Sequence, residues 1–452
     1  MTIEAIQAYI AEDAQQRARK LRLYKYYRGE HDILRRQQED ASKPNNRLCH
    51  GYPQMIANAY TGYLFADPIT YTATNDEALM DAVNACYKYN DEQSENARIG
   101  LDLSICGMAV ELMYVDEQGF ERFVRVDPCG CIAVTDHTIE DNLTELIRYY
   151  DTYDVVTRTN VGTVEVYDAE MVSVYTVTGG VEAGIGTLEL VEERPHGFRD
   201  VPAVVYKNNP EGMGDFETVL TLIDAYDLMQ SEALNDQEYF TDAYLVLHGI
   251  GEMKPEDVND MKRNRVLLMP EDAGAEWLIK SQPDALPENI KNRLNKDIQR
   301  FSGCPDMSDE NFAANASGVA IRYKLLQFEN NAGIKERELK RGLQRRLELL
   351  CNLWQTLGRG AHDWRSVQIS CKRSLPQNLL ELSQTLGNLS DIISDETKRS
   401  LLPLDIDEDT ERARLQEQNG EGLFTPKERK SGVISPVERE DTVKIEADGD
   451  GE

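Results

Sequence analysis

Apolar residues along the chain follow two different spacings, and the change between them marks the main regions of the fold. Up to about residue 104 they recur every three or four positions, as on the buried face of an amphipathic helix. From residue 108 onward they alternate with polar residues, which is the period of a strand with one buried face. The first region is therefore predicted to form helices over residues 3–28, 53–64, 75–90 and 93–104.

The alternating region predicts antiparallel strands. Residues 108–115 and 120–126 are joined by a short polar turn, in which Gly119 can take the positive φ that such turns require. These strands follow one another between helical regions, without the βαβ alternation of a nucleotide-binding fold, so the sequence predicts the α+β class. Further strands are expected at residues 147–150, 161–167, 171–177, 186–191 and 203–206, as a meander.

Helical spacing returns in the second half of the chain. The longest apolar stripe there has steps of four, four, three and four residues, which predicts one long helix. The stripe consists of Leu339, Leu343, Leu347, Leu350 and Trp354. The predicted elements are a helix (215–240), a small unit (243–283) with strands at 243–247, 265–269 and 275–279 and a helix from Pro255, a helix (287–301), a loop (303–318), a long helix (319–357) and two helices within 375–402.

Composition indicates a globular and acidic protein. Of its 452 residues 41% are hydrophobic, enough for a sizeable core, and the formal net charge is −31. A surface this acidic does not hold duplex DNA over its whole extent, so any DNA contact must be local or weak. No apolar run approaches the roughly 18 residues of a membrane span. The eight cysteines are scattered, which is typical of reduced thiols inside a cell.

The sequence carries no motif of a catalytic or cofactor site. It has no GxxxxGK[ST] phosphate loop, no GxGxxG, no HExxH and no GxSxG. Residues 405–409 resemble half of a calcium loop, but Thr410 replaces the turn glycine and Gln416 the last ligand. Cys129 and Cys131 lack the second cysteine pair or histidine of a zinc site. We therefore expect no enzyme, no catalytic residue, no metal and no cofactor.

Two predicted helices carry basic residues at helical spacing. Arg293, Lys296 and Arg300 lie on one face of the helix 287–301, opposite an apolar stripe, and this face either contacts phosphate or is simply solvated. On the long helix the basic repeat is expected to form salt bridges to acidic neighbours instead. That repeat consists of Arg337, Arg341 and Arg345, with Lys340 and Arg346 beside it.

Several short segments, taken in order over about residues 20–355, resemble the portal proteins of long-tailed bacteriophages, in the subfamily typified by a Bacillus siphophage. Each segment alone is weak, but their order and spacing are specific. The acidic C-terminal part contributes little to the resemblance. The segments are residues 26–33, 43–47, 62–69, 104–109, 126–128, 214–217, 222–227, 240–247 and 315–324.

The resemblance implies a homo-oligomeric ring of about twelve subunits at one capsid vertex. Such a ring passes double-stranded DNA inward and later outward. It docks the terminase large subunit, the head-tail adaptor, and the capsid and scaffold proteins, and it contacts no membrane. It would be assembled in the bacterial host cytoplasm and remain in the virion. Hydrolysis of ATP belongs to the terminase, in agreement with the missing phosphate loop.

The family's regions map onto this chain in order. They comprise a mixed α/β wing, a two-helix stem, a small α/β clip, a tunnel loop and a helical crown. Their expected ranges are the wing (1–214), first stem helix (215–242), clip (243–284), second stem helix (285–302), tunnel loop (303–318), long wing helix and return strand (319–374), crown (375–415) and a disordered acidic tail (416–452).

Within this scheme three groups of residues are expected to serve function. Twelve copies at −31 carry about −370 formal charges, so the channel repels DNA except at local basic rings. The stem face Arg293, Lys296 and Arg300 would supply one such ring. The tunnel-loop residues are Asp306, Met307, Ser308, Asp309, Glu310, Asn311 and Phe312. The partner-binding residues of the clip are Lys254, Glu256, Asp257, Lys262, Arg263 and Arg265.

Two other functions remain open on the sequence. In the first, the chain is a capsid adaptor or scaffold protein that forms no ring; in the second, it is an unrecognised hydrolase that uses scattered carboxylates. Purified protein that shows rings with a central hole would distinguish the first possibility from both alternatives.

Overall fold

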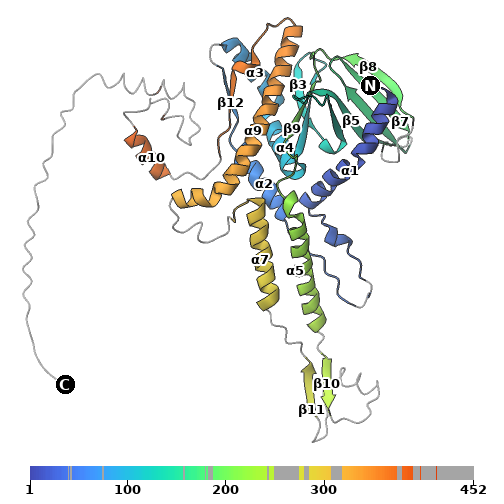
Figure 1. Ribbon diagram of the computed structural model, residues 1–452, viewed down its shortest axis with the longest axis vertical. Coiled ribbons are helices and arrows are strands. Elements are labelled where there is room, and N and C mark those ends of the chain that lie inside the picture. Colours follow the sequence, from blue (N-terminus) through green and yellow to red (C-terminus); the bar gives the residue numbers. More distant parts are fainter. Residues whose placement is uncertain are drawn as a thin grey trace, which may run out of the picture. The chain divides into compact units, whose positions relative to one another are not determined.

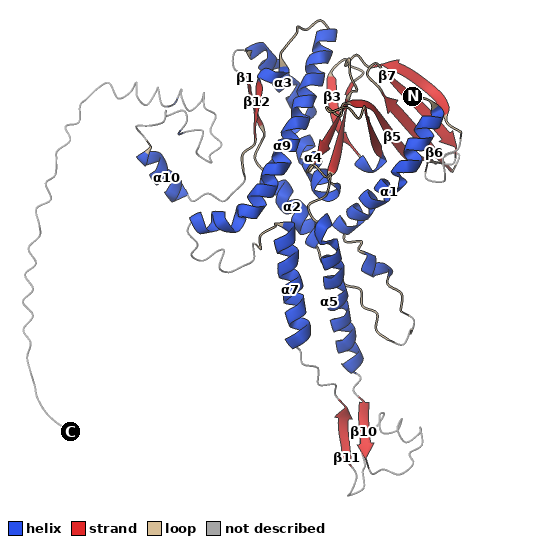
Figure 2. Cartoon of the chain, in the orientation of Figure 1, coloured by secondary structure: helices blue, strands red, loops and turns tan. Residues whose placement is uncertain are grey.

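The computed structural model describes most of the chain, in two compact units, Met1–Leu375 and Pro376–Glu452. The second unit contains the helix α10 (Leu379–Asn388), which lies within the range where two helices were predicted. Figures 1 and 2 show the course of the chain and its secondary structure. The described residues are 1–38, 40, 43–73, 76–155, 158–178, 180–181, 187–241, 244–248, 274–278, 285–306, 318–373, 379–389, 398 and 414.

The four N-terminal helices form where the apolar spacing predicts them. Thr2 caps the first of them and Asp76 the third, each through a hydrogen bond from a backbone amide to the side-chain oxygen. The chain leaves the first helix through Gly29, whose φ of +80° suits glycine. The helices are α1 (Ile3–Tyr27), α2 (Tyr52–Phe65), α3 (Glu77–Asn90) and α4 (Glu92–Cys106).

The described strands between residues 108 and 207 form two sheets rather than one meander, which corrects the prediction. The predicted hairpin is present as β2 (Met108–Val115) and β3 (Glu121–Val126), with Gly119 at a φ of +84° in its turn. However, β9 (Ala203–Lys207) pairs with β2 and completes a three-stranded sheet in the order β3-β2-β9. The strand β2 is the central strand of this sheet, and most of its residues are buried on both faces.

The second sheet has five strands in the order β4-β5-β6-β7-β8, all antiparallel. Its last strand lies at residues 189–195 rather than at 186–191 as predicted, and its first strand was not predicted because it is short and mixed in polarity. One face packs against Ile6 and Ile10 of α1. The other face packs against the three-stranded sheet. The strands are β4 (Cys131–Thr135), β5 (Leu143–Asp154), β6 (Thr159–Tyr167), β7 (Met171–Thr178) and β8 (Glu189–Pro195).

The long predicted helix is α9 (Gly318–Thr356), and its apolar stripe enters the main core. All five residues of that stripe are buried there beside α3, α4 and the three-stranded sheet. Tyr206 of β9 approaches α9 so closely that a Cβ on Gly342 would lie 2.2 Å from its ring. After α9 the chain returns as β12 (Val367–Ser370), which pairs antiparallel with β1 (Thr70–Ala73).

Two helices, α5 (Leu220–Thr241) and α7 (Ala285–Ser302), pack against each other and run antiparallel (Figure 1). The first begins later than predicted, because a 3-10 turn occupies Glu217–Val219. Two strands within the connecting segment, β10 (Tyr244–His248) and β11 (Gly274–Leu278), pair antiparallel and match two predicted strands within one residue. The helix predicted from Pro255 and the strand predicted at 265–269 lie outside the described residues.

Among the described helices, none combines the length and the apolar content that crossing a bilayer requires.

Candidate functional site

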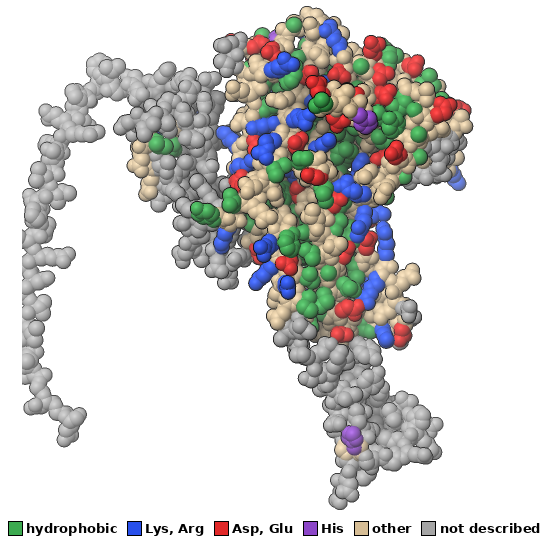
Figure 3. Space-filling view, in the orientation of Figure 1, with side chains coloured by type: hydrophobic (Ala, Val, Ile, Leu, Met, Phe, Trp, Pro, Cys, Tyr) green, Lys and Arg blue, Asp and Glu red, His purple; other side chains and the backbone are tan. Residues whose placement is uncertain are grey.

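The basic face predicted on the helix 287–301 is present as an exposed face of α7. Arg293, Lys296 and Arg300 are all exposed, and the side chain of Arg293 has an exposed fraction of 85%. Its only ion pair within the described residues is a loose one, 3.8 Å from Arg293 Nε to Asp297 Oδ2. Figure 3 shows Lys and Arg side chains gathered over α7 and α9 on the face in view.

The opposite face of α7 is fixed to the body, and this determines which way the basic face points. Ile298 is fully buried, and the Tyr52 hydroxyl of α2 donates a hydrogen bond of 2.8 Å to Asn295 Oδ1. At 100° per residue, the three basic positions lie on the far side of the helix from Asn295 and Ile298. The body therefore presents these cations outward.

Both α5 and α7 also expose large apolar side chains. Leu228 and Leu234 of α5 have exposed fractions of 43% and 39%, and Phe301 of α7 has 58%. Ile290 of α7 has 39%. Apolar side chains that are exposed on neighbouring helices of one subunit are typical of a surface that another protein covers.

One side of α5 carries a stripe of polar side chains at steps of three and four residues. The stripe consists of Asp224, Asp227, Ser231, Asn235 and Glu238. Each member accepts a hydrogen bond from α1 or from the segment that follows it, residues 31–50. This polar stripe therefore holds the described part of the segment 31–50 along α5.

In two contacts of the stripe, side chains of α5 accept hydrogen bonds from backbone amides of the segment 31–50. The backbone amide of Asn46 donates to Asn235 Oδ1 at 2.7 Å, and the amide of Leu48 donates to Ser231 Oγ at 2.9 Å. Backbone groups of an irregular segment must find partners when they leave water, and α5 supplies them. The sequence alone does not reveal this stripe, because polar residues at helical spacing are more often solvated and the partners are about 180 residues away.

The start of the predicted loop 303–318 is also fixed. The Tyr60 hydroxyl donates to the carbonyl of Ser302 at 3.0 Å, and Asn331 Nδ2 of α9 donates to that hydroxyl at 3.0 Å. Gly303 then turns the chain at a φ of +70°, and Cys304 is buried beneath it. The start of the loop thus leaves from a junction of α2, α7 and α9.

A buried lysine joins three elements at the same junction. Lys335 Nζ of α9 donates to Asp215 Oδ2 at 2.7 Å, just before α5, and to Ser104 Oγ of α4 at 2.5 Å. It also lies 5.2 Å from the centre of the Tyr60 ring. Burial lowers the pKa of Lys335, and the carboxylate of Asp215 opposes that shift. Lys335 therefore joins α9 to the end of α4 and to the residues just before α5.

The basic repeat on α9 divides between the core and the surface. Salt bridges were expected, and Arg345 forms them, 2.7 Å to Asp200 and 2.8 Å to Glu348. Arg337 and Arg341 are exposed instead, and neither has an ion pair with a described residue. They point away from the core because they lie on the side of the helix opposite the apolar stripe.

Arg346 is fully buried, at the centre of a polar network in the core. Its Nε and Nη2 atoms each donate to Glu111 of β2 at 2.8 Å, and Nη2 also donates to Asn96 at 2.9 Å. Glu92 lies 3.4 Å from Nη1. Burial raises the pKa of Glu92, and Arg346 opposes the shift. The network connects α9 with α4 and the three-stranded sheet.

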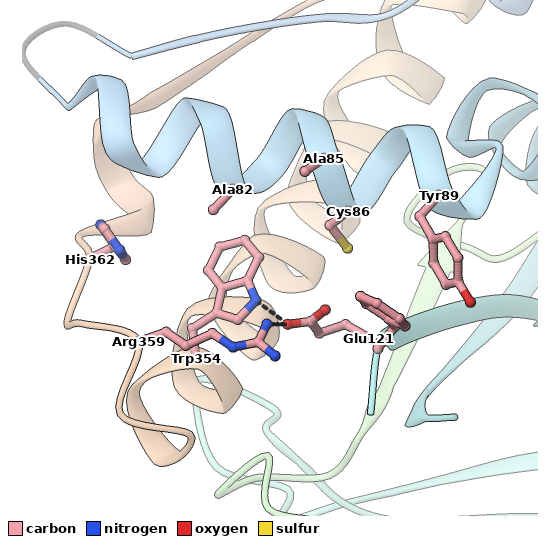
Figure 4. A pocket seen from close by; sticks show the side chains of 9 residues that line it. Ala82, Ala85, Cys86, Tyr89, Glu121, Trp354, Arg359 and His362 are labelled. Atoms are coloured by element: carbon pink, nitrogen blue, oxygen red, sulfur yellow. Dashed lines mark hydrogen bonds and ion pairs between the residues drawn. The ribbon is translucent and has the colours of Figure 1, made fainter. Parts of the chain in front are cut away.

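A pocket of about 310 Å³ lies near the end of α9 (Figure 4). Its polar groups are already paired, since Glu121 accepts hydrogen bonds from Trp354 Nε1 at 2.6 Å and from Arg359. Burial raises the pKa of the Cys86 thiol to about 12, which leaves it unreactive. The pocket therefore offers no activated nucleophile. Its walls are Ala82, Ala85, Cys86, Tyr89, Phe120, Glu121, Trp354, Arg359 and His362.

Of the other predicted site residues, only Asp306 is described, and it is partly buried at the start of the loop. Met307, Ser308, Asp309, Glu310, Asn311 and Phe312 lie outside the described residues. The same holds for the predicted clip residues Lys254, Glu256, Asp257, Lys262, Arg263 and Arg265.

Known proteins are similar in sequence to this chain over most of its length. A family model described as "Phage portal protein, SPP1 Gp6-like" matches residues 6–422. The portal protein of Bacillus phage SPP1 is 24% identical over 430 residues, which cover 92% of this chain and 83% of that protein. The portal protein of Clostridium phage phiCD119 is 24% identical over 407 residues, covering 84% of this chain and 88% of that protein.

Proposed function

Because this chain belongs to the SPP1 Gp6-like family of phage portal proteins, we propose that its copies form a ring at one capsid vertex through which double-stranded DNA is packaged and ejected. The family is structural rather than enzymatic, and its members are part of the virion. The observation that carries the proposal is the antiparallel pair of α5 and α7, which bears the strand pair β10–β11 between its helices.

In this assignment α5 and α7 are the stem, and residues 243–284 are the clip that meets the terminase large subunit and later the head-tail adaptor. Residues 1–214 and 319–374 form the wing, residues 375–415 the crown, and residues 303–318 the tunnel loop. The fixed start of this loop, at Ser302 and Gly303, supports its role because a constriction must be held by a rigid base. Capsid and scaffold proteins would contact the ring from outside.

Ring formation is supported by the apolar side chains that the stem exposes. Leu228, Leu234, Ile290 and Phe301 would be covered by the stems of neighbouring copies, which is the closed, repeated contact that a cyclic oligomer makes. At −31 per chain the copies repel one another over long distances, so short-range apolar contacts have to hold the ring together.

The same acidic charge suits a channel through which DNA slides. A bore lined mainly by acidic groups repels phosphate, and Arg293, Lys296 and Arg300 of each stem would supply a local attraction without a permanent grip. In the tunnel loop, Asp306, Asp309 and Glu310 would repel the duplex, while Met307 and Phe312 would touch it without directional bonds.

We expect the variant R293Q/K296Q/R300Q to form rings and to package several-fold less DNA, because each subunit loses three cations that face phosphate. Nuclease-protected DNA per capsid measures the effect. The matched control is R98Q/R337Q/R341Q, which removes the same charge from exposed positions of the proposed wing. Equal packaging by the two variants would contradict the assignment of this face to the channel.

A further inference from the structure

We propose that His31, Cys49 and Asp227 bind a divalent transition-metal ion of the zinc type, at the point where the segment 31–50 crosses α5. One ligand atom from each residue lies within 4.8 Å of the other two. His31 and Asp227 are buried, and Cys49 is partly exposed, which leaves a path for the ion. An imidazole nitrogen, a thiolate and a carboxylate oxygen together favour zinc or cobalt over magnesium or calcium.

The hydrogen bonds of His31 are the strongest indication. Its Nε2 atom lies 3.1 Å from the carbonyl oxygen of Tyr26, which can only accept, so Nε2 carries the proton. Its Nδ1 atom lies 2.5 Å from Asp227 Oδ2, which is also an acceptor. With its proton on Nε2, a neutral imidazole keeps a lone pair on Nδ1, which is the nitrogen that would bind the ion. The 2.5 Å contact between Nδ1 and Oδ2 is a hydrogen-bond distance, so these two atoms would move apart by roughly 1 Å to bind a tetrahedral ion between them.

The surroundings favour the metal ion. A backbone carbonyl on the other ring nitrogen is the contact that orients histidine ligands in metal sites. The second oxygen of Asp227 is fixed by His50, whose amide lies at 2.9 Å and whose Nδ1 lies at 2.7 Å from Oδ1. Oδ2 faces His31 Nδ1 and is the carboxylate oxygen that would bind the ion. Water would complete a tetrahedral shell.

The charges balance when the metal is bound. Burial raises the pKa of the Cys49 thiol, so Cys49 holds its proton in the absence of an ion. Binding releases that proton to solvent. A thiolate and a carboxylate then neutralise the divalent cation, and no oxidant or reductant takes part.

The bound ion would fasten the segment 31–50 to α5, across a separation of 196 residues between His31 and Asp227. The polar stripe of α5 already holds this segment by hydrogen bonds, and the metal would lock it at its most buried point. This inference rests on the fold of one subunit. It does not depend on ring formation.

Cobalt titration of the full-length chain, stripped with a chelator, tests the site. We expect one Co²⁺ per chain, with the intense visible bands of tetrahedral cobalt and a near-ultraviolet thiolate-to-cobalt band, all removed by added Zn²⁺. The variant C49S should lose the thiolate band. Its affinity for Co²⁺ should fall by more than the roughly 10–100-fold that the loss of an outer-shell partner typically causes. The control C371S alters another partly exposed thiol and should keep the band.

Zinc should also raise the melting temperature of the wild-type chain and of C371S, but not that of C49S. Because Cys49 is partly exposed, its replacement by serine leaves the core intact, and an unchanged circular dichroism spectrum checks this. If the chain shows no cobalt–thiolate band, or if the band persists in C49S, a proton joins His31 to Asp227 and the metal site is refuted.

Discussion

Replacing Arg346 with methionine should lower the free energy of unfolding by about 3–5 kcal/mol, the range observed when one partner of a buried ion pair is removed. Arg346 and Glu111 are both fully buried, and the guanidinium contacts both carboxylate oxygens of Glu111. Methionine fills much of the same volume but leaves Glu111 and Glu92 without a cation. Urea denaturation monitored by circular dichroism measures the loss as a lower midpoint.

The control for this variant is R341M, which removes an exposed arginine from the same helix. We expect it to change stability by no more than about 0.5 kcal/mol. The double variant R346M/E111L should recover much of the loss, since well-packed apolar residues can replace a buried pair at little cost. If R346M and R341M were equally stable, the buried network would not hold α9 in place.

Replacing Gly107 with alanine should destabilise the protein by about 1–3 kcal/mol more than replacing Gly29, because only Gly107 is closely packed. The two glycines have nearly the same φ, +81° and +80°. A Cβ on Gly107 would lie 2.1 Å from the carbonyl oxygen of Gly212, whereas nothing lies within 4 Å of one on Gly29. Both variants bear the left-handed backbone penalty of about 1–2 kcal/mol, so their difference isolates the clash.

The clash at Gly107 should also displace the turn that precedes α5. The amide of Asn208 donates to the carbonyl of Gly107 at 2.9 Å, and the amide of Asp215 donates to the carbonyl of Ser104 at 2.8 Å. The turn that precedes α5 therefore rests on the end of α4. Thermal unfolding of G107A and G29A measures the difference, and equal melting temperatures would mean that this turn moves aside freely.

Elements with one strong apolar face could be predicted from sequence because their spacing is a local property. The stripe from Leu339 to Trp354 has the period of a helix, and α9 follows it within one residue at each end of the predicted range. The basic face of α7 could be predicted for the same reason, since Arg293, Lys296 and Arg300 lie opposite residues that pack. The pairing of β9 with β2 could not, because neither strand's own pattern encodes its partner.

The sequence also could not predict which charged residues are buried in the core. Arg346 sits beside the surface residue Arg345 in the sequence, and one step of 100° turns it into the core, where its partner Glu111 is 235 residues away. His31 and Asp227 are separated almost as far. Charged side chains of this kind look like solvated positions until the fold brings a second charge to them.

Electron microscopy of the purified full-length chain, over a range of salt and up to high protein concentration, tests the central claim most directly. If the chain is a portal subunit, particles under assembly conditions are rings with a central hole wide enough for a DNA duplex. Particles that remain single subunits, without any ring at every salt and protein concentration, would contradict it.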